Sequence, residues 1–302
     1  MAPIVFFAYN RPDHTRRSLE ALQKNPEAAN SFLRIYIDGP KANASAETIA
    51  NIKAVRNVAA EKQWCGRVEI IASPENKGLF SSISSGITNT INEFGRIIVL
   101  EDDVLVSPGF LAYMNEALEL YEQTPEVMHI SGYSRPQFNS AGLEDATYFF
   151  YHTSCWGWAT WKRAWDKFRP EPLALQKKLK EKGGIYQLNM DGTYEFYWGL
   201  KAIAEKRFQS WNYIWHSTVF LNDGLCLHPA QSLVSNIGHD GSGTNCSVDE
   251  GFASNDQLAE KIVLKRIPLK QNAQLRKIYR DSHSARYKFL FAIRHYLRFL
   301  KK

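Results

Sequence analysis

Three consecutive carboxylates, Glu101, Asp102 and Asp103, follow a short apolar run at residues 97–100. A continuous apolar run of this length indicates a strand that is buried on both faces. Acids at the carboxyl end of such a strand lie at the edge of an open α/β sheet, where these sheets bind ligands. Adjacent carboxylates repel one another, and their hard oxygen atoms suit Mg²⁺ and Mn²⁺. The pattern therefore predicts a divalent metal that carries a phosphorylated ligand, and the alternative is a solvated acidic turn.

The first hundred residues alternate between apolar runs and amphipathic segments. Strands are expected at residues 4–8, 33–37, 67–72 and 97–100, and helices at residues 13–24, 44–60 and 78–94. This alternation is typical of a parallel, doubly wound α/β sheet. Right-handed crossovers bring the strand ends to one edge. The polar residues that follow the strands would then outline a nucleotide pocket together with the acids; they are Tyr9, Asn10, Arg11, Asp38 and Lys77.

The second half mixes strands, helices and aromatic residues. Strands are expected at residues 127–131, 148–151 and 225–228, and helices at residues 108–122, 173–182, 194–206 and 211–221. A tryptophan-rich turn lies at residues 155–161 and a Gly-rich loop at residues 235–243. We expect one domain over residues 1–260, with a nucleotide-binding half at 1–105 and an acceptor half at 106–260, followed by a tail at 261–302.

Composition places the chain among globular proteins. It has 302 residues, of which 44% are hydrophobic and 23% charged, and it carries 8 tryptophans. Its four cysteines have no spacing typical of a disulfide framework or a zinc site, which favours a reduced, cytoplasmic setting. No run approaches the ~20 apolar residues of a membrane span. The first residues are expected to form a strand rather than a signal peptide.

The tail differs in charge from the rest of the chain. Residues 261–302 hold 13 lysines and arginines against one acid, Asp281. Apolar side chains recur at helical intervals among these basic residues, at Phe289, Leu290, Ile293, Tyr296, Leu297 and Leu300. This pattern predicts a basic amphipathic helix that lies on an anionic membrane surface. A helix docked on the domain, or an oligomer contact, is the alternative. Nucleic acid is not expected as a partner, because no recognisable binding module is present.

Five segments, taken together and in this order, resemble GT-A-fold glycosyltransferases, particularly the bacterial family-2-type enzymes, and also the N-acetylglucosaminyltransferase I family. The resemblance covers roughly residues 3–250. It rests on PIVFFAYNRP at Pro3–Pro12, YID at Tyr36–Asp38, ENKG at Glu75–Gly78, LEDDV at Leu100–Val104 and WGWATW at Trp156–Trp161.

The resemblance implies a role for each matching residue. Asp103 would ligate Mn²⁺ or Mg²⁺, Asp102 would approach the ribose or the metal, and Glu101 would approach the donor sugar. Asp38 would pair with the uracil edge, Lys77 would contact the diphosphate, and Tyr9, Asn10 and Arg11 would border the base and phosphates. His239 would supply a late nitrogen ligand to the metal. As alternatives, Asp38 caps the following helix and Lys77 is a solvated turn residue.

A general base is also required, because an inverting transfer must deprotonate the acceptor hydroxyl. Glu195 opens an expected helix in the segment where relatives usually carry an acid. Asp240, in the Gly-rich loop, is the competing candidate. Trp158 is expected to line the acceptor, because sugar C–H faces pack well on indole rings. Local core packing of the tryptophans is the alternative.

The expected activity is therefore that of a metal-dependent, inverting glycosyltransferase. It would move a sugar from a UDP-sugar to a glycan or lipid-linked saccharide during synthesis of a surface polysaccharide, such as lipopolysaccharide, and act peripherally on the cytoplasmic face of a bacterial membrane. A nucleotidyltransferase would need a Gly-rich basic loop after the first strand, where this chain has Tyr9–Pro12. A non-catalytic carbohydrate-binding protein would explain the tryptophans but not Glu101, Asp102 and Asp103.

Overall fold

The computed structural model describes residues 1–138, 142–143, 145–241, 257–282 and 293. The first half confirms the predicted alternation. Strands β1 (Ile4–Ala8), β2 (Phe32–Ile37), β3 (Arg67–Ala72) and β4 (Arg96–Glu101) are joined by α1 (Pro12–Gln23), α2 (Ala46–Ala60) and α3 (Leu79–Phe94), with the short 3₁₀ helix η1 (Pro26–Asn30) before β2. These four strands are parallel in the order β3-β2-β1-β4. Their carboxyl ends therefore share one edge.

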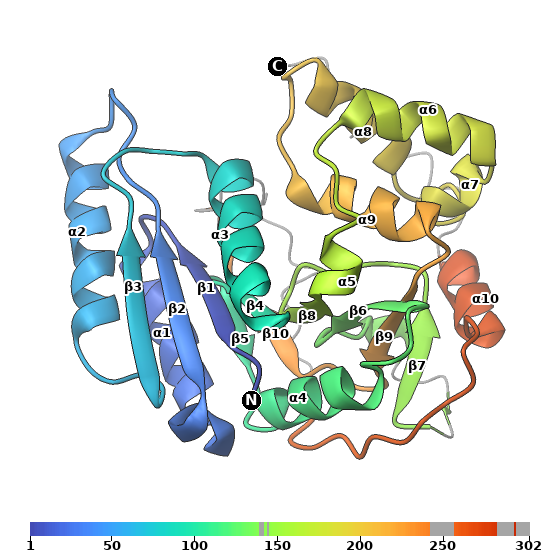
Figure 1. The fold of residues 1–302 in the computed structure, drawn as a ribbon, viewed down its shortest axis with the longest axis horizontal. Helices are drawn as coiled ribbons and strands as arrows, with labels where there is room; N and C mark the ends of the chain where they lie inside the picture. The colour runs from blue at the N-terminus through green and yellow to red at the C-terminus, as the bar shows by residue number, and fades with distance from the viewer. Residues whose placement is uncertain (139–141, 144, 242–256, 283–292, 294–302) are drawn as a thin grey trace.

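The same sheet continues into the second half. Strand β8 (Trp158–Trp161) lies antiparallel between β4 and β6 (Val127–Ser131), and β9 (Leu225–Pro229) and β7 (Thr147–Phe150) complete eight strands. The α/β class with a largely parallel sheet is confirmed, and each antiparallel pairing of this sheet involves a strand of the second half, β8 or β7. The two predicted halves of the domain therefore share one continuous sheet (Figure 1).

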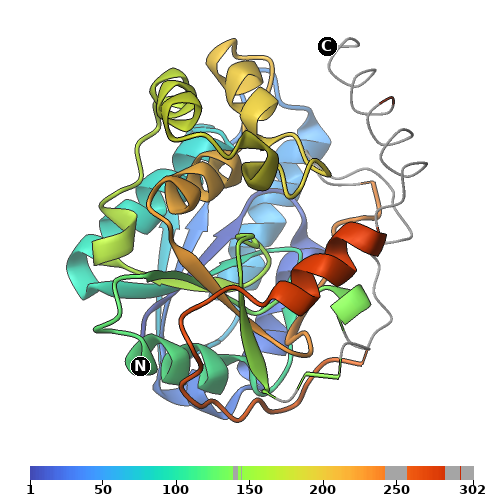
Figure 2. The same ribbon diagram turned by 90° about the vertical axis from the view of Figure 1, so that its right-hand side faces the viewer.

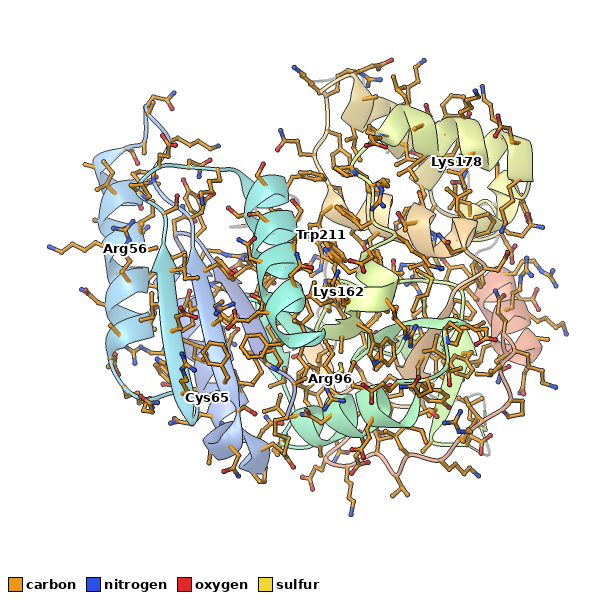
Figure 3. The ribbon with its side chains drawn as sticks, viewed as in Figure 1. Arg56, Cys65, Arg96, Lys162, Lys178 and Trp211 are labelled. Atoms are coloured by element: carbon orange, nitrogen blue, oxygen red, sulfur yellow. The ribbon has the colours of Figure 1, made fainter. Side chains whose placement is uncertain are left out.

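Helices cover both faces of this sheet. Alternate residues of β1 divide between two cores: Ile4 and Phe6 pack with α1, α2 and α4 (Phe110–Leu120), whereas Val5 and Phe7 pack on the α3 side. The second core also includes α5 (Lys162–Trp165) and α9 (Trp211–Leu221), and α6 (Pro172–Lys182), α7 (Ile185–Leu188) and α8 (Phe196–Ala204) lie beyond α9. Trp211, at the start of α9, lies in the middle of the molecule where α9 faces α3 (Figure 3).

Local sequence sets the start of α2 and the end of α3. The Ser45 hydroxyl caps α2 by accepting from the Thr48 amide at 3.1 Å. Helix α3 ends at Gly95, whose φ of 78° is a left-handed conformation that suits glycine. The short 3₁₀ helix η2 (Pro136–Phe138) follows β6.

A two-stranded ribbon connects the acidic strand end to the Gly-rich loop. Strand β5 (Val104–Val106) pairs antiparallel with β10 (Val234–Asn236), and Val104 lies opposite Asn236. The amide of Ile237 donates to the carbonyl of Asp103 at 2.8 Å. This ribbon was not predicted, because three-residue strands carry too little periodicity to be recognised. It places residues 237–240 directly beside the carboxylates.

The basic C-terminal region begins as part of the globular body. Helix α10 (Ala273–Ser282) packs on the second half of the chain (Figure 2), and its Leu275 and Tyr279 are fully buried. The Arg276 guanidinium donates to both carboxylate oxygens of Asp191, at 2.9 and 2.7 Å. Except for Ile293, the apolar positions of the predicted membrane-surface helix lie outside the described residues. Every helix within the described ranges is too short or too polar to cross a membrane.

Candidate active site

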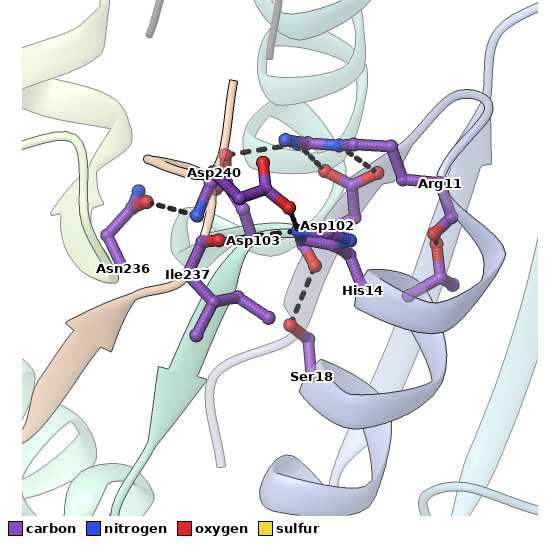
Figure 4. Close-up of polar contacts among 10 residues, drawn as sticks. Arg11, His14, Ser18, Asp102, Asp103, Asn236, Ile237 and Asp240 are labelled. Carbon is purple, nitrogen blue, oxygen red and sulfur yellow. Dashed lines mark hydrogen bonds and ion pairs between the residues drawn. The ribbon is translucent and has the colours of Figure 1, made fainter. Parts of the chain in front are cut away.

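Arg11, Asp102 and Asp103 form the centre of the site (Figure 4). Asp102 and Asp103 follow β4, and Arg11 stands immediately before α1 at the end of the neighbouring strand β1. The Arg11 Nη2 atom donates to Oδ1 of Asp102, and also to Oδ2 of Asp103 at 3.0 Å. Both carboxylates are thus directed at one positively charged position.

Burial and mutual repulsion perturb the pKa values of these groups. The pKa of Glu101 is raised to about 8, first by burial and then by the charges of Asp103 and Asp102. The pKa of Asp102 is also raised, because burial outweighs the opposing effect of Arg11. The pKa of Arg11 is raised as well, since the two aspartates overcome the cost of burying its charge. Joint ionisation of these three acids is therefore unfavourable unless a positive charge lies beside them.

Helix α1 and the loop after β10 complete the surroundings of the acids. The Ser18 hydroxyl donates to the carbonyl of Asp102 at 2.8 Å. His14 Nε2 lies 3.3 Å from the carbonyl oxygen of Ile237 and 3.2 Å from Oδ2 of Asp240. The predicted base candidate Asp240 is therefore brought next to the acidic centre, and its side chain remains about half exposed.

Gly238 packs directly on Asp103. A Cβ atom at position 238 would lie 2.4 Å from Oδ2 of Asp103 and 3.0 Å from its Cγ. A side chain at position 238 would have to displace the Asp103 carboxylate or move the loop, which accounts for a glycine here. The next residue, His239, is half-buried and its ring lies edge-on to Trp156, with 5.7 Å between ring centroids.

The donor set fits a divalent cation that is completed by a ligand. Within the described ranges, no group of three or more His, Cys, Asp or Glu side chains is arranged to hold a metal ion. Mg²⁺ usually takes only one or two carboxylates, together with waters and substrate phosphates. Asp102 and Asp103 meet this requirement, since their oxygen atoms already converge on one cationic nitrogen.

Asp38 has a structural role that the sequence did not indicate. Its Oδ1 accepts from the amides of Gly39 and Lys77 at 3.0 and 2.9 Å. Its Oδ2 accepts from the amide of Gly78 and the side chain of Asn76 at 3.0 and 3.1 Å. Asp38 therefore does not cap the helix that follows it but fixes the loop that leads into α3. A uracil ring bound to the Asp38 carboxylate would have to share its oxygen atoms with these four hydrogen-bond donors.

The other predicted nucleotide contacts lie around the same strand ends. Tyr9 follows β1, and its pKa is raised by burial and by the nearby charge of Asp38. Asn10 is half-buried between Tyr9 and Arg11. Lys77 donates its backbone amide to Asp38, and the residue is exposed. Tyr9, Asp38 and Lys77 are therefore brought together, on the side of Arg11 that faces β2 and β3.

The prediction that Trp158 lines the acceptor is wrong. Trp158 is fully buried in β8, and its indole stacks between His129 and Trp211, with 5.2 Å between centroids on each side. The partly exposed member of the motif is Trp156, whose ring lies 4.6 Å from that of Tyr133. The sequence alone does not show which of these tryptophans is buried, because the motif follows neither a strand nor a helix periodicity.

Glu195 lies outside the acidic centre but near the same sheet edge. It immediately precedes α8, between Tyr194 and Phe196. The rings of Tyr194 and Phe196 lie 6.3 and 6.2 Å from the ring of His152, which follows β7. The two base candidates are thus placed differently: Asp240 beside the acids, and Glu195 on the second half of the chain.

His14 and Gly238 are site residues that the sequence did not identify. A single histidine in an amphipathic helix is usually a surface or core residue, so nothing in the chain marked His14. Gly238 was recognised only as one glycine of a Gly-rich loop. Its contact with Asp103 depends on the pairing of β5 with β10, which brings together residues more than a hundred positions apart.

No protein-family model matches the sequence, and no curated protein matches it. Solved structures with a similar fold include residues 1–349 of S. aureus TarS, at 10% identity and a TM-score of 0.43, covering 78% of this chain and 60% of that one. Mouse xyloside xylosyltransferase 1 is similar at 11% identity and a TM-score of 0.36, covering 68% and 83%. Galactosyltransferase LgtC with donor and acceptor sugar analogues is similar at 13% identity and a TM-score of 0.33, covering 72% and 70%.

The chain thus spans less than two thirds of the TarS chain that it matches. These likenesses are distant, and the function proposed below follows from the site residues themselves.

Proposed function

We propose that this chain is a glycosyltransferase that moves a sugar from a UDP-sugar to a glycan or lipid-linked saccharide, with inversion at the anomeric carbon. The observation that supports this most directly is the convergence of Asp102 and Asp103 on one cationic position. That position lies at the carboxyl edge of a parallel sheet and beside the start of α1. A nucleotide diphosphate needs positive charge, and this edge is where such sheets bind nucleotides.

Asp102 and Asp103 would hold Mn²⁺ or Mg²⁺, and His239 is a candidate for a further ligand. When bound, the ion would neutralise the charge that develops on the leaving diphosphate. Arg11 would turn from the two aspartates toward the phosphates, where a guanidinium can bind two oxygen atoms at once.

The remaining residues would position the two substrates. Tyr9, Asn10, Asp38 and Lys77 lie on the nucleotide side, and Glu101 would contact the donor sugar. Asp240 is one candidate for the general base, and His14 contacts its carboxylate at 3.2 Å next to the acidic centre. Glu195 remains the competing candidate, since it lies on the side where an acceptor would enter. Trp156 takes the place that was expected for Trp158, because its ring is partly exposed.

The biological setting is also part of the proposal. We place the enzyme on the cytoplasmic face of a bacterial membrane, where it would build a surface polysaccharide such as lipopolysaccharide. The excess of lysine and arginine after residue 261 supports contact with an anionic surface. Deletion of the residues after Ser284 is expected to move the protein from the membrane fraction to the soluble fraction. Unchanged partitioning would contradict the membrane contact.

A panel of UDP-sugars tests the enzyme itself. We expect Mn²⁺-dependent hydrolysis or transfer from at least one of them, and Asp103→Asn should lower both activity and UDP binding at least 100-fold. Asp166→Asn is the matched control, because Asp166 is an exposed carboxylate at the end of α5, outside the acidic centre. Incubation with UTP and sugar 1-phosphates separates the alternative: release of pyrophosphate would identify a nucleotidyltransferase. If no UDP-sugar reacts and Asp103→Asn binds UDP normally, the proposal is wrong.

A further inference from the structure

Arg135 is a buried cation that forms no ion pair with a carboxylate of the described residues. It follows β6, and only 9% of its surface is exposed. Its guanidinium lies over the ring of Tyr279, at 4.8 Å from the centroid, and its Nη2 donates weakly to the sulfur of Met190 at 3.8 Å. Across the part of the chain that the structure describes, no carboxylate forms an ion pair with it.

The neighbouring groups do not neutralise this charge. Asp191 follows Met190 in the chain, but both of its carboxylate oxygens are bound by Arg276. The tyrosines near Arg135 are neutral at physiological pH; burial raises the pKa of Tyr194, for example, to about 12. Burying a charge without a partner is strongly unfavourable, so an anion that reaches Arg135 would offset part of that cost.

Arg135 lies on the same sheet edge as the acidic centre. Strands β4 and β6 run in the same direction with β8 between them, so their carboxyl ends are separated by two strand spacings, about 10 Å. A row of packed rings connects the two places. The ring centroids of Tyr133 and Trp156 are 4.6 Å apart, and those of Trp156 and His239 are 5.7 Å apart. His239 directly follows Gly238, the glycine that packs on Asp103.

This row separates the two sides of the site. Arg11 and the start of α1 lie toward β1, on the nucleotide side. Arg135 lies beyond Trp156, toward β9 and β7, together with His152 and the start of α8. The pKa of His152 is lowered mainly by burial and next by the charge of Arg135, so the two side chains are close. Arg135 is therefore poorly placed for the donor diphosphate and well placed for the second substrate.

We propose that Arg135 binds an anionic group, a phosphate or a carboxylate, carried by the acceptor saccharide. This inference rests on the proposed transferase function, because it assigns the acceptor to this side of the rings. A bidentate contact from a guanidinium to such a group is worth roughly a ten- to hundred-fold change in affinity. A neutral saccharide would bring no charge to offset that of the guanidinium.

Three sugars that differ only at C6 test the proposal: glucose, glucuronic acid and glucose 6-phosphate. Each is titrated calorimetrically into the full chain with UDP and Mn²⁺ present, so that the nucleotide side is filled. We expect at least one charged sugar to bind ten-fold or more tightly than glucose, and the sugar that does so distinguishes carboxylate from phosphate. Arg135→Gln should reduce its affinity to that of glucose, and Arg135→Lys should retain part of it.

Arg266→Gln is the matched control, because Arg266 also lies over a tyrosine ring, at 5.4 Å, but at the opposite end of β6. Its affinities should equal those of the unchanged protein. Equal binding of all three sugars, or a preference that survives in Arg135→Gln, would overturn the proposal. If Arg135→Gln does not fold, raising KCl from 50 to 500 mM decides the question: only the charged sugar should weaken. UDP binding is measured separately in the same samples, so failure of the donor site is distinguished from failure at Arg135.

Discussion

Arg11→Gln tests the electrostatic organisation of the acidic centre most directly. Arg11 Nη2 lies 3.0 Å from Oδ2 of Asp103, and the two side chains are 17% and 11% exposed. Coulomb's law gives about 1.4 kcal/mol for such a pair in water and about 5.5 kcal/mol at an effective dielectric constant of 20. Removal of one partner of a buried pair typically costs about 3–5 kcal/mol. Since this pair is partly exposed, we expect a loss of about 3 kcal/mol in the free energy of unfolding.

The same substitution should strengthen metal binding. A divalent ion held by Asp102 and Asp103 would be repelled by Arg11, and each unit charge at 4 Å contributes about 1 kcal/mol even in water. Loss of the guanidinium should therefore favour Mn²⁺ by about 2 kcal/mol, which corresponds to a roughly thirty-fold lower Kd. The variant is expected to be less stable than the unchanged protein in EDTA and to gain more stability from Mn²⁺.

Thermal unfolding in EDTA and across a Mn²⁺ titration measures both effects. For a chain of this size, about 3 kcal/mol corresponds to a Tm lower by roughly 6 °C. Arg16→Gln is the control, because Arg16 lies on the same helix but pairs with Glu61 at the surface. If Arg11→Gln is as stable as the unchanged protein in EDTA, or if Mn²⁺ stabilises both equally, the two carboxylates do not share one cation position.

Three further substitutions test other parts of the structure. Gly238→Ala places a methyl group 2.4 Å from Asp103 Oδ2 and should weaken binding of UDP with Mn²⁺ at least ten-fold in calorimetry, whereas unchanged affinity would show that the loop yields freely. Asp191→Asn should lower the free energy of unfolding in urea by about 3 kcal/mol, because it breaks a buried pair, whereas Asp223→Asn, at an exposed pair, should cost less than about 1 kcal/mol. Burial lowers the pKa of His216 from 6.5 to about 4, so the unfolded chain binds a proton first and stability falls as the pH drops below 6.5. His216→Gln should remove about 2 kcal/mol of the loss measured in urea between pH 7 and 5, and an unchanged pH dependence would contradict the buried neutral imidazole.

The first half of the fold was predictable because its signals are local. Each strand from β1 to β4 is a short stretch of mainly apolar residues, and the connecting helices repeat apolar residues every three or four positions, as α3 does with Ile83, Ile87 and Ile91. The second half was less predictable. All four residues of β8 are buried, so the strand shows no alternation of buried and exposed positions. It also enters the sheet between β4 and β6, and no local pattern indicates this position.

The site shows the same division. Asp102 and Asp103 were identified because acids after a buried strand are conspicuous, and Arg11 was identified because it follows the first strand. Their direct contact depends on the pairing of β1 with β4, which the expected parallel sheet already implied. His14 was not identified, because its neighbours come from the loop after β10, more than two hundred positions away. No local pattern encodes such a contact.

The distribution of charge along the sheet edge supports one assignment of the two substrates. Arg11 is a cation that two carboxylates already neutralise, so it is released only when something else, a metal or a phosphate, takes over one of its partners. Arg135 is a cation that no described carboxylate neutralises, so it is ready to bind an anion at once. A ligand that brings its own cation suits the first position, and a ligand that brings only negative charge suits the second. A metal–nucleotide on the Arg11 side and an acidic saccharide on the Arg135 side satisfy both conditions, and the reverse arrangement satisfies neither.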